Sequence, residues 1–332
     1  MDEIRELRAK NPADLLAMVP YLLGFHPEDS VVMVSLGAAG TPVHARQDLP
    51  GRPDEIPEVV DDLARVAVRA EVDRVVVVVY SDDELLGDAV GRELSGVLGD
   101  AGVGVPLALR ADGDRWFCLG DRDGSCTRDC PADGTPYDLA RHPLTLQAVL
   151  DGRVVHASRE ALRDSLVAVD PDEVDRVAAA VEAAAGRLRA AGHGHLVQEG
   201  RWVQHRVARF LEDGRRLDSH DVGRLVVAVG SVDVRDVAWA QIGHADARRH
   251  VDLWRDVVRR SPGETLAAPA ALLAFAAWLA GDGALGWCAV EVSQEAEPGY
   301  GLAGLVTQAL AAGVPPTAWV PVGPEALRLF AG

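Results

Sequence analysis

Four residues in the middle of the chain have side chains of the types that bind metal ions. Cys118, Cys126 and Cys130 are spaced C-x7-C-x3-C, and His142 follows twelve residues after Cys130. Three thiolates and an imidazole could hold a structural zinc ion, which prefers tetrahedral sulfur and nitrogen ligands. However, the chain lacks the common C-x2-C pair, and Cys118 ends an expected strand, where its side chain would point into the core. We therefore favour ordinary buried or loop cysteines, with a zinc site and a redox-linked Cys126–Cys130 pair as alternatives.

A second candidate site lies near the N-terminus, in the segment GFHPEDS. His26, Asp29 and Ser30 have the residue types of an acid–base–nucleophile set. Catalytic triads are assembled from distant loops, whereas these residues fall within five consecutive positions. We expect Asp29 or Ser30 to fix a turn by bonding local backbone, with catalysis by His26 and Asp29 as the alternative.

Three polar residues follow the clearest predicted strand. The run VVVVVY at 75–80 is β-branched, and Ser81, Asp82 and Asp83 come directly after it. Ligands of open α/β sheets bind beyond the carboxyl ends of strands, where paired aspartates could hold Mg²⁺ or orient a polar substrate. Ser or Asp at this position would also cap a helix at 84–98. We favour the cap, with a catalytic role of Asp82 and Asp83 as the alternative.

The commonest signatures of nucleotide-binding and hydrolytic enzymes are absent from the sequence. No G-x-G-x-x-G opens a helix after an expected strand, and neither H-E-x-x-H nor G-x-S-x-G occurs. Lys10 is the single lysine, so the chain has no P-loop lysine. These motif-defined classes are excluded, while the question of whether the protein is an enzyme stays open.

One expected helix is locally basic: it carries Arg201, His205, Arg206 and Arg209, with Arg215 and Arg216 just beyond. In a chain this acidic we expect these side chains to be solvated and to pair with Asp and Glu, and an anion site is the alternative. His193 and His195, in the segment GHGH, could ligate a metal, but we favour a Gly-rich loop between helices.

Most of the tryptophans lie in the second part of the chain, six of the seven beyond residue 200. Trp239, Trp254 and Trp278 fall at apolar positions of expected helices, so we expect them in the core. Exposed tryptophans would instead mark a protein-binding surface.

Hydrophobic patterns predict the elements that must position these residues. Up to about residue 140, expected elements follow the order β-β-α-β-α-β-β, and the run at 75–80 predicts a strand buried on both faces. We therefore predict an α/β domain with a mixed sheet over residues 1–140. The segment from 119 to 137 is a long loop, which is typical of functional segments.

From about residue 141 onward the hydrophobic period is almost entirely helical. We predict an all-α domain of stacked helices over residues 141–332. Two Pro-Gly pairs, at 262–263 and 298–299, lie 36 residues apart, as in stacked helical hairpins. A helical-hairpin repeat and chance recurrence explain this spacing about equally well.

Three segments carry a family likeness: PADLLAMVPYLLGFHPEDSVVMVSL near the start, RWFCLGDRDGSCTRDCPADGTPYD in the middle and LLAFAAWLAGDGALGWCAVEVSQEAEPGYGLAGLVTQALAAGVPPTAW near the end. In this order they resemble the actinobacterial DUF4192 family, a domain of unknown function, over nearly the whole chain. The resemblance implies an intracellular actinobacterial protein and implies no reaction, ligand or catalytic residue. Adjacent cysteines often precede the proline of the family's middle motif, whereas here only Cys130 precedes Pro131.

Composition and charge disfavour several classes of partner. The 332 residues include 33 Lys or Arg and 51 Asp or Glu, a formal net charge of −18, which would repel phosphate backbones and anionic lipids. The longest apolar stretch, 267–280, is shorter than the roughly 20 residues that span a bilayer and predicts a buried helix. Neither a signal-peptide pattern nor a disulfide framework is indicated. We expect a cytoplasmic protein that binds neither nucleic acid nor membrane.

The function that these patterns favour is a protein-binding or regulatory module whose helical half engages another protein. One alternative is an enzyme that acts on a nucleotide-like or phosphorylated small molecule at the carboxyl edge of the sheet. The other is a metal- or redox-sensing protein that uses the cysteine loop. The oligomeric state does not follow from the sequence.

Overall fold

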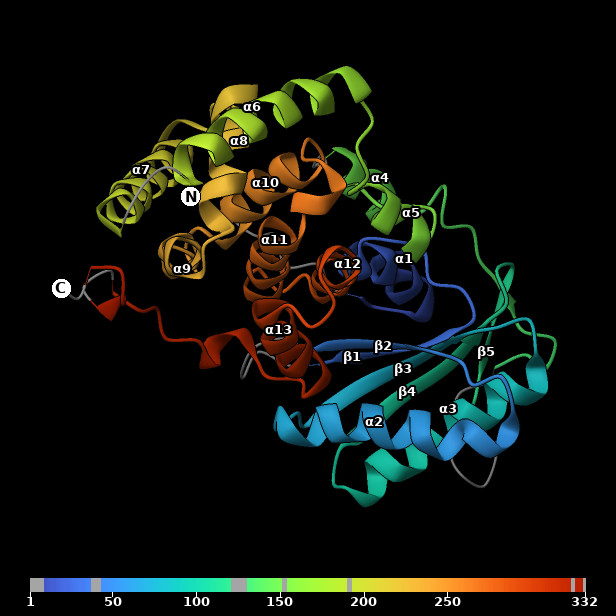
Figure 1. The fold of residues 1–332 in the computed structure, drawn as a ribbon. Helices are drawn as coiled ribbons and strands as arrows, with labels where there is room; N and C mark the ends of the chain where they lie inside the picture. The colour runs from blue at the N-terminus through green and yellow to red at the C-terminus, as the bar shows by residue number, and fades with distance from the viewer. Residues whose placement is uncertain are drawn as a thin grey trace. The chain divides into compact units, whose positions relative to one another are not determined.

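The computed structural model describes residues 9–36, 43–120, 130–150, 154–189, 193–323 and 326–330 (Figure 1). Contacts divide the chain into a sheet unit, Met1–Ala161 with Ala311–Pro315, and a helical unit, Leu162–Leu310 with Pro316–Gly332. This division lies later than the predicted boundary at residue 140, because α4 (Pro143–Leu150) packs on α1 (Pro12–Leu23). The Tyr21 hydroxyl of α1 donates to the Thr145 carbonyl of α4 at 3.3 Å.

The sheet unit contains the predicted mixed sheet, with a short sixth strand at 135–136 that corrects the expectation of a loop over the whole segment 119–137. Its strands are β1 (Ser30–Ser35), β2 (His44–Asp48), β3 (Arg74–Tyr80), β4 (Gly104–Ala111), β5 (Arg115–Cys118) and β6 (Thr135–Pro136). They follow the order β2-β1-β3-β4-β5-β6 across the sheet. β3 and β4 are parallel, and the other neighbouring strands are antiparallel.

β3 lies at the centre of the hydrophobic core of this unit. Every residue from Val75 to Tyr80 is buried, which confirms the predicted burial of both faces. Because successive side chains of a strand point to opposite faces, Val75, Val77 and Val79 share one face. That face packs against α2 (Ile56–Arg69) and α3 (Glu84–Asp100), which Figure 1 shows lying along the sheet.

α1 begins and ends at the residues that the sequence indicates. The Asn11 side chain caps it by accepting a hydrogen bond from the Asp14 N–H at 2.8 Å, and Gly24 ends it with a φ of +78°. The helix continues through Pro20 to Leu23, although proline cannot donate the backbone hydrogen bond of a helix interior. Burial of Leu16 and its apolar neighbours on the same helix face compensates for the hydrogen bond that proline cannot donate.

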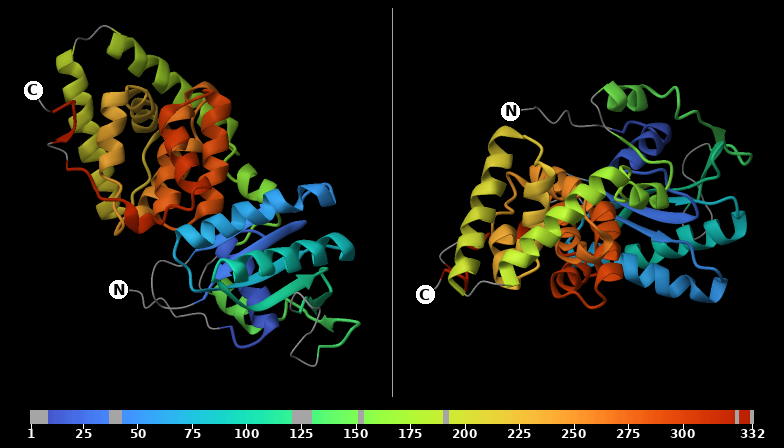
Figure 2. Two further views of the ribbon diagram at one scale, coloured as in Figure 1. Left: turned by 90° about the horizontal axis from the view of Figure 1, so that it is seen from below. Right: turned by 45° about the horizontal axis from the view of Figure 1, so that its top comes forward.

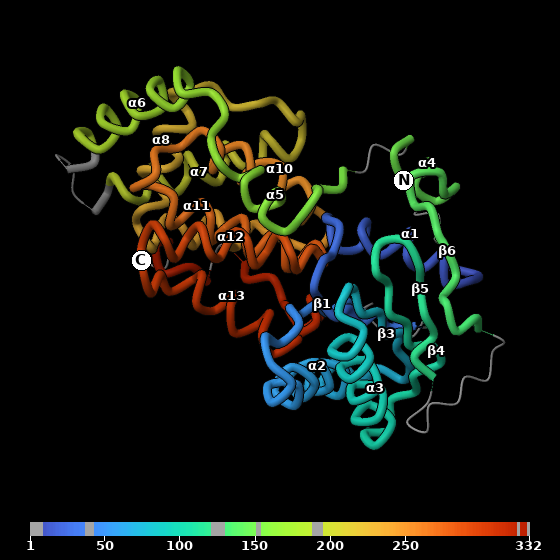
Figure 3. The backbone as a smooth tube through the Cα atoms, turned by 90° about the vertical axis from the view of Figure 1, so that its right-hand side faces the viewer, coloured from blue at the N-terminus to red at the C-terminus, as the bar shows by residue number. Residues whose placement is uncertain are grey.

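The helical unit is a stack of helices, as predicted (Figure 2). These are α6 (Pro171–Arg189), α7 (His193–Asp213), α8 (Ser219–Val229), α9 (Val232–Ala240), α10 (Ala247–Val258), α11 (Ala267–Leu279), α12 (Gly283–Ala296) and α13 (Gly301–Ala311), preceded by α5 (Arg159–Asp164) at the boundary. All 13 residues of α11 are buried, which confirms the core helix predicted at 267–280. Figure 3 shows α11, α12 and α13 as successive segments of the stack. None of the described helices is long and apolar enough to cross a membrane.

Two further segments of the second part of the chain contain β-branched residues. The run at 224–229 belongs to α8, and the segment around His156 forms an isolated bridge with Phe25. The Pro-Gly pairs lie between helices, one between α10 and α11 and the other between α12 and α13. The helical-hairpin repeat itself stays a prediction.

An ionic network joins three parts of the helical unit. Glu173 of α6 accepts hydrogen bonds from Arg176 at 2.9 Å, from Ser219 of α8 at 3.0 Å and from Arg260, just beyond α10, at 2.7 Å. Burial raises the pKa of Glu173, but these hydrogen bonds together outweigh burial and lower the pKa to about 2. Arg260 is buried and also donates to Asp256 at 2.8 Å, so its charge is compensated as well.

Candidate functional site

The carboxyl edge of the sheet holds the residues that follow β3. Asp83 is the N-cap of α3, because its Oδ1 accepts a hydrogen bond from the Leu86 N–H at 3.0 Å. The Ser81 hydroxyl oxygen accepts one from the Asp83 N–H at 3.1 Å, and Asp82 is exposed. The favoured interpretation as a helix cap is thus confirmed for Asp83, and a catalytic role of the two aspartates stays a prediction.

Behind this edge lies a buried ion pair that the sequence analysis did not predict. Arg110 of β4 is 4% exposed and donates from Nε to Asp88 Oδ1 of α3 at 3.0 Å. Its Nη1 donates to the Ser81 carbonyl at 3.4 Å, and its guanidinium lies 4.2 Å from the centre of the Phe117 ring. A Cβ at Gly87 would lie 2.9 Å from Arg110 Cδ, so glycine makes room for this side chain. Because both charges are compensated, the pair is suited to holding β4 against α3.

The loop between α1 and β1 has the geometry of a turn. His26 and Asp29 are exposed, whereas Ser30 is fully buried and its hydroxyl has no hydrogen-bond partner among the described residues. Asp29 adopts a left-handed φ of +38°, which aspartate tolerates in turns. The His26 N–H donates to the His156 carbonyl at 3.0 Å. The chain bends at Asp29, but the Ser30 hydroxyl does not make the expected bond to local backbone, and catalysis by His26 and Asp29 stays a prediction.

The cysteine segment is only partly described. Cys118 in β5 and Cys130 are both half-buried, and Cys126 lies outside the described residues. His142 Nε2 lies 3.2 Å from Asp14 Oδ1, and its Nδ1 accepts a backbone N–H at 3.3 Å. A zinc ion would therefore have to displace one of two existing partners of His142. The zinc site and the Cys126–Cys130 pair both stay predictions.

Within the described part of the chain, three potential metal ligands gather at the start of α8. Asp218, His220 and Asp221 offer ligand atoms that all lie within 4.8 Å of one another. Asp218 is the N-cap and accepts the Asp221 N–H at 2.7 Å, and Asp221 accepts from Arg206 Nε at 2.7 Å. The Asp218 carboxylate therefore caps α8, and the Asp221 carboxylate forms an ion pair with Arg206. Arg206 and Arg216, which pairs with Asp256 at 2.8 Å, confirm the expected pairing of the basic segment with acidic residues.

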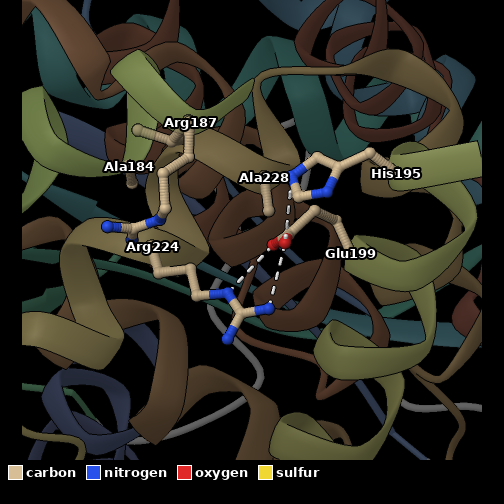
Figure 4. Close-up of a pocket in the computed structure, with 7 residues that line it drawn as sticks. Ala184, Arg187, His195, Glu199, Arg224 and Ala228 are labelled. Carbon is tan, nitrogen blue, oxygen red and sulfur yellow. Dashed lines mark hydrogen bonds and ion pairs between the residues drawn. The ribbon is translucent and has the colours of Figure 1, made fainter. Parts of the chain in front are cut away.

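A small pocket opens between α6, α7 and α8, and Figure 4 shows its lining. The pocket is lined by Ala184, Arg187, His195, Glu199, Arg224, Val227 and Ala228. The empty space between these residues, with the open mouth included, is about 230 Å³. Glu199 is buried and points between His195 Nε2, at 3.4 Å, and Arg224, which donates two hydrogen bonds at 2.9 and 3.0 Å. Arg224 also lies 4.1 Å from the centre of the Trp202 ring. The pair of Glu199 and Arg224 thus compensates its own charge and links α7 to α8.

Residues 193–195 of the segment GHGH lie in a helix, which corrects our expectation of a loop there. α7 begins at His193, whose side chain lies outside the description, so His195 is already a helical residue. Its place one turn before Glu199 explains the helical conformation, since the two side chains meet on one helix face at i and i+4.

Of the three tryptophans that we expected in the core, Trp254 and Trp278 are buried there, whereas Trp239 is half-buried. Trp254 is fully buried, and Trp278 is nearly so. Trp239 packs edge-on against Phe275 with ring centres 5.7 Å apart, and Trp319 lies 4.8 Å from Trp239. These rings pack against one another within the helical unit, and Trp239 and Trp319 stay half-buried.

A group of exposed apolar side chains lies on and just after α4. Leu146, Val149 and Leu150 are 54, 62 and 81% exposed, and Val154 beyond the helix is 75% exposed. The spacing i, i+3, i+4 places the first three on one side of the helix, while Ala148 is buried. We call Leu146, Val149, Leu150 and Val154 the α4 face. Exposed apolar side chains that gather on one side of a helix are typical of interaction sites.

Comparison with known proteins identifies a family for the whole fold. The family model DUF4192, described as a domain of unknown function, matches residues 12–317. No curated protein and no solved structure matches the chain. The matched range includes the sheet unit's strands, α4 and all helices of the helical unit. The chain therefore belongs to the DUF4192 family.

Proposed function

We propose that the protein is a protein-binding module and that the α4 face contacts the partner. The supporting observation is the exposure of its four aliphatic side chains, three of them on one side of a short helix. Removing such side chains from water favours association by roughly 1 kcal/mol for each half-exposed residue. α4 follows the predicted boundary at residue 140, but it belongs to the sheet unit, so the proposed surface is not on the helical unit for which the sequence predicts partner binding.

The charge distribution of α4 supports the same proposal. Its sequence, PLTLQAVL, contains no charged residue, although the chain carries a net charge of −18. Charged residues are depleted at the centres of protein interfaces because their desolvation is unfavourable. An apolar helix of a partner could therefore pack on α4 without leaving a charge unpaired.

The experiment compares the α4 face with a solitary exposed leucine. A photo-crosslinking amino acid replaces Leu150, or as the matched control Leu85 of α3, which is 85% exposed. After irradiation in the native host we expect a discrete adduct from position 150 and none from position 85. Leu146→Gln together with Val149→Gln should remove that adduct without changing the amount of folded protein. Equal adducts from both positions, or an adduct that survives the double substitution, would reject the proposal.

The alternative functions have less support among the described residues. Asp83 is committed to a helix cap, and both ring nitrogens of His142 have protein partners. An enzyme at the sheet edge and a metal or redox sensor in the cysteine loop stay predictions. Stoichiometric zinc in the purified protein, lost in Cys126→Ser, would favour the sensor over the binding module.

A further inference from the structure

The small pocket between α6, α7 and α8 forms where short side chains separate two closely packed helices (Figure 4). α6 and α8 approach closely at Gly223 of α8, because a Cβ at this glycine would lie 2.5 Å from the Cβ of Ala180 of α6. About one turn further along each helix, Ala184 and Ala228 are buried and line the pocket. The packing of α6 on α8 therefore leaves a recess in which polar side chains of three helices meet.

The charged side chains of this pocket carry more positive than negative charge. Arg187 and Arg224 are cationic, and Glu199 is the carboxylate among the lining residues. Glu199 accepts two hydrogen bonds from Arg224, so these two charges compensate each other. Arg187 is exposed and has no ion-pair partner among the residues that the structure describes. In a chain with 51 acidic residues and 33 lysines and arginines, the pocket thus retains an uncompensated cation.

His195 supplies a second group without a partner. Its Nε2 lies 3.4 Å from Glu199 Oε1, and a carboxylate oxygen only accepts hydrogen bonds, so Nε2 carries the ring proton. In the neutral ring Nδ1 is then an acceptor, and it has no hydrogen-bond partner within the described part of the chain. The two groups have opposite requirements, because the Arg187 guanidinium needs an acceptor and His195 Nδ1 needs a donor.

We propose that this pocket binds the hydrogen phosphate ion through the Arg187 guanidinium and His195 Nδ1. A guanidinium donates parallel N–H groups to phosphate oxygens, and the O–H group of the same ion donates to the imidazole nitrogen. Sulfate and carboxylate ions accept hydrogen bonds but have no O–H group near neutral pH, so they satisfy only the arginine.

The net charge of −18 does not prevent a small anion from binding here. Charges more than about 8 Å away are largely screened at physiological ionic strength, so the neighbouring cation dominates for a small ion. A long polyanion would also meet the acidic surface elsewhere. The pocket lies in the helical unit, and its test does not depend on the function proposed for the α4 face.

The experiment titrates the whole chain with sodium phosphate at about pH 7.5 and constant ionic strength, with isothermal titration calorimetry as the readout. We expect saturable binding with a Kd about tenfold lower than that of sodium sulfate, because sulfate cannot donate to His195. Methyl phosphate is mostly a dianion without an O–H group at this pH and should bind as weakly as sulfate.

Three outcomes of these titrations would overturn the proposal. Phosphate that gives no saturable heat would show that the pocket is not an anion site. Equal Kd values for phosphate and sulfate would show that His195 accepts no hydrogen bond from the ion. Methyl phosphate that binds as tightly as phosphate would assign the pocket to a phosphomonoester in place of the free ion.

Two substitutions separate the contributions of the two groups. Arg187→Gln should raise the Kd for both phosphate and sulfate about tenfold, since both ions accept from the guanidinium. His195→Ala should raise the Kd for phosphate and leave that for sulfate unchanged, so the preference for phosphate disappears. Sulfate binding by this variant also shows that the pocket is still folded.

The matched control is Arg201→Gln, which removes an exposed arginine of α7 that does not line the pocket. This change should alter each Kd by less than about twofold, because salt screens an exposed charge outside the site. Equal losses in Arg187→Gln and Arg201→Gln would mean that phosphate responds only to the overall charge of the protein, and the assignment to this pocket would be wrong.

Discussion

α4 and α11 both lack charged residues, yet they have opposite environments. Every residue of α11 is buried, with α10 and α12 packed against it. α4 buries Ala148 and leaves Leu146, Val149 and Leu150 exposed. Apolar composition therefore does not decide burial by itself: a helix becomes core only where the rest of the chain supplies elements to cover it.

Because of this difference, α11 contributes to the free energy of folding and α4 to the free energy of association. Apolar side chains that the chain covers contribute to the free energy of folding, whereas those left in water contribute to association when a partner covers them. Substitutions in and around α11 should therefore change stability, and substitutions in α4 should change binding.

The largest effect on stability is expected from the network that holds the helices around α11. Glu173→Ala leaves the buried Arg260 without its main carboxylate partner and should lower the free energy of unfolding by about 4 kcal/mol. Urea denaturation measures this loss. The exposed Glu182 on the same helix provides the control, and Glu182→Ala should change stability by less than about 0.5 kcal/mol. Similar losses in both variants would show that the buried pair does not anchor the unit.

A cavity in α11 should have nearly as large an effect. Leu272 is fully buried, and Leu272→Ala should cost about 3 to 4 kcal/mol through lost transfer free energy and the cavity left behind. The matched exposed position is Leu305 of α13, where the same change should cost less than about 0.5 kcal/mol. A small loss at Leu272 would mean that α11 is not the core of the unit.

The helical core should also lose stability in acid through His250. Burial lowers the pKa of His250 to about 4, against the opposing hydrogen bond to the Gln241 carbonyl and the charge of Asp246. The unfolded state, with a pKa near 6.5, binds the proton first as the pH falls. Stability is therefore unaffected above pH 6.5 and falls by about 3 kcal/mol between pH 6.5 and pH 4. His250→Gln should remove this slope, and a wild-type slope that persists in the variant would assign the acid sensitivity to other groups.

A smaller effect on stability is expected when the exposed helix cap at Asp83 is removed. Asp82 and Asp83 are both exposed, but only Asp83 caps α3. Asp83→Ala should cost about 1 kcal/mol, and Asp82→Ala close to nothing, in thermal unfolding of the two variants. Equal melting temperatures of the two variants would show that the Asp83 cap does not stabilise the protein.

The smallest effect on stability is expected in α4 itself. Leu150→Ser should change the free energy of unfolding by less than about 0.5 kcal/mol, because the side chain is 81% exposed and has little contact to lose. Urea denaturation of the variant measures this. A loss comparable to that of Leu272→Ala would show that α4 is covered within the chain, and the contrast between the two helices would disappear.

The predictions from sequence held where the signal is local. A β-branched run was enough to predict β3, and a long apolar stretch was enough to predict α11. An aspartate before a helical pattern was enough to predict the cap at Asp83. Each of these depends on residues that are neighbours along the chain, so backbone propensity and side-chain pattern carry the information.

The contacts that the sequence did not reveal join residues far apart along the chain. The pairing of Arg110 with Asp88 depends on how α3 packs against β4, and Gly200 of α7 leaves the space that the distant Leu329 fills. α1 continues through Pro20 because burial of its apolar side chains compensates for the missing donor. In each case a distant element changes the balance that local propensity would set.

The amino-acid sequence by itself determined the two kinds of architecture, the order of the elements, the core strand and core helix, and the DUF4192 likeness. Only the tertiary structure decided which apolar helix is covered, which carboxylates are ion-paired and which residues pack against Gly200. The physical reason is that hydrophobicity and helix capping act over a few residues, whereas burial and charge compensation depend on which distant segments approach one another.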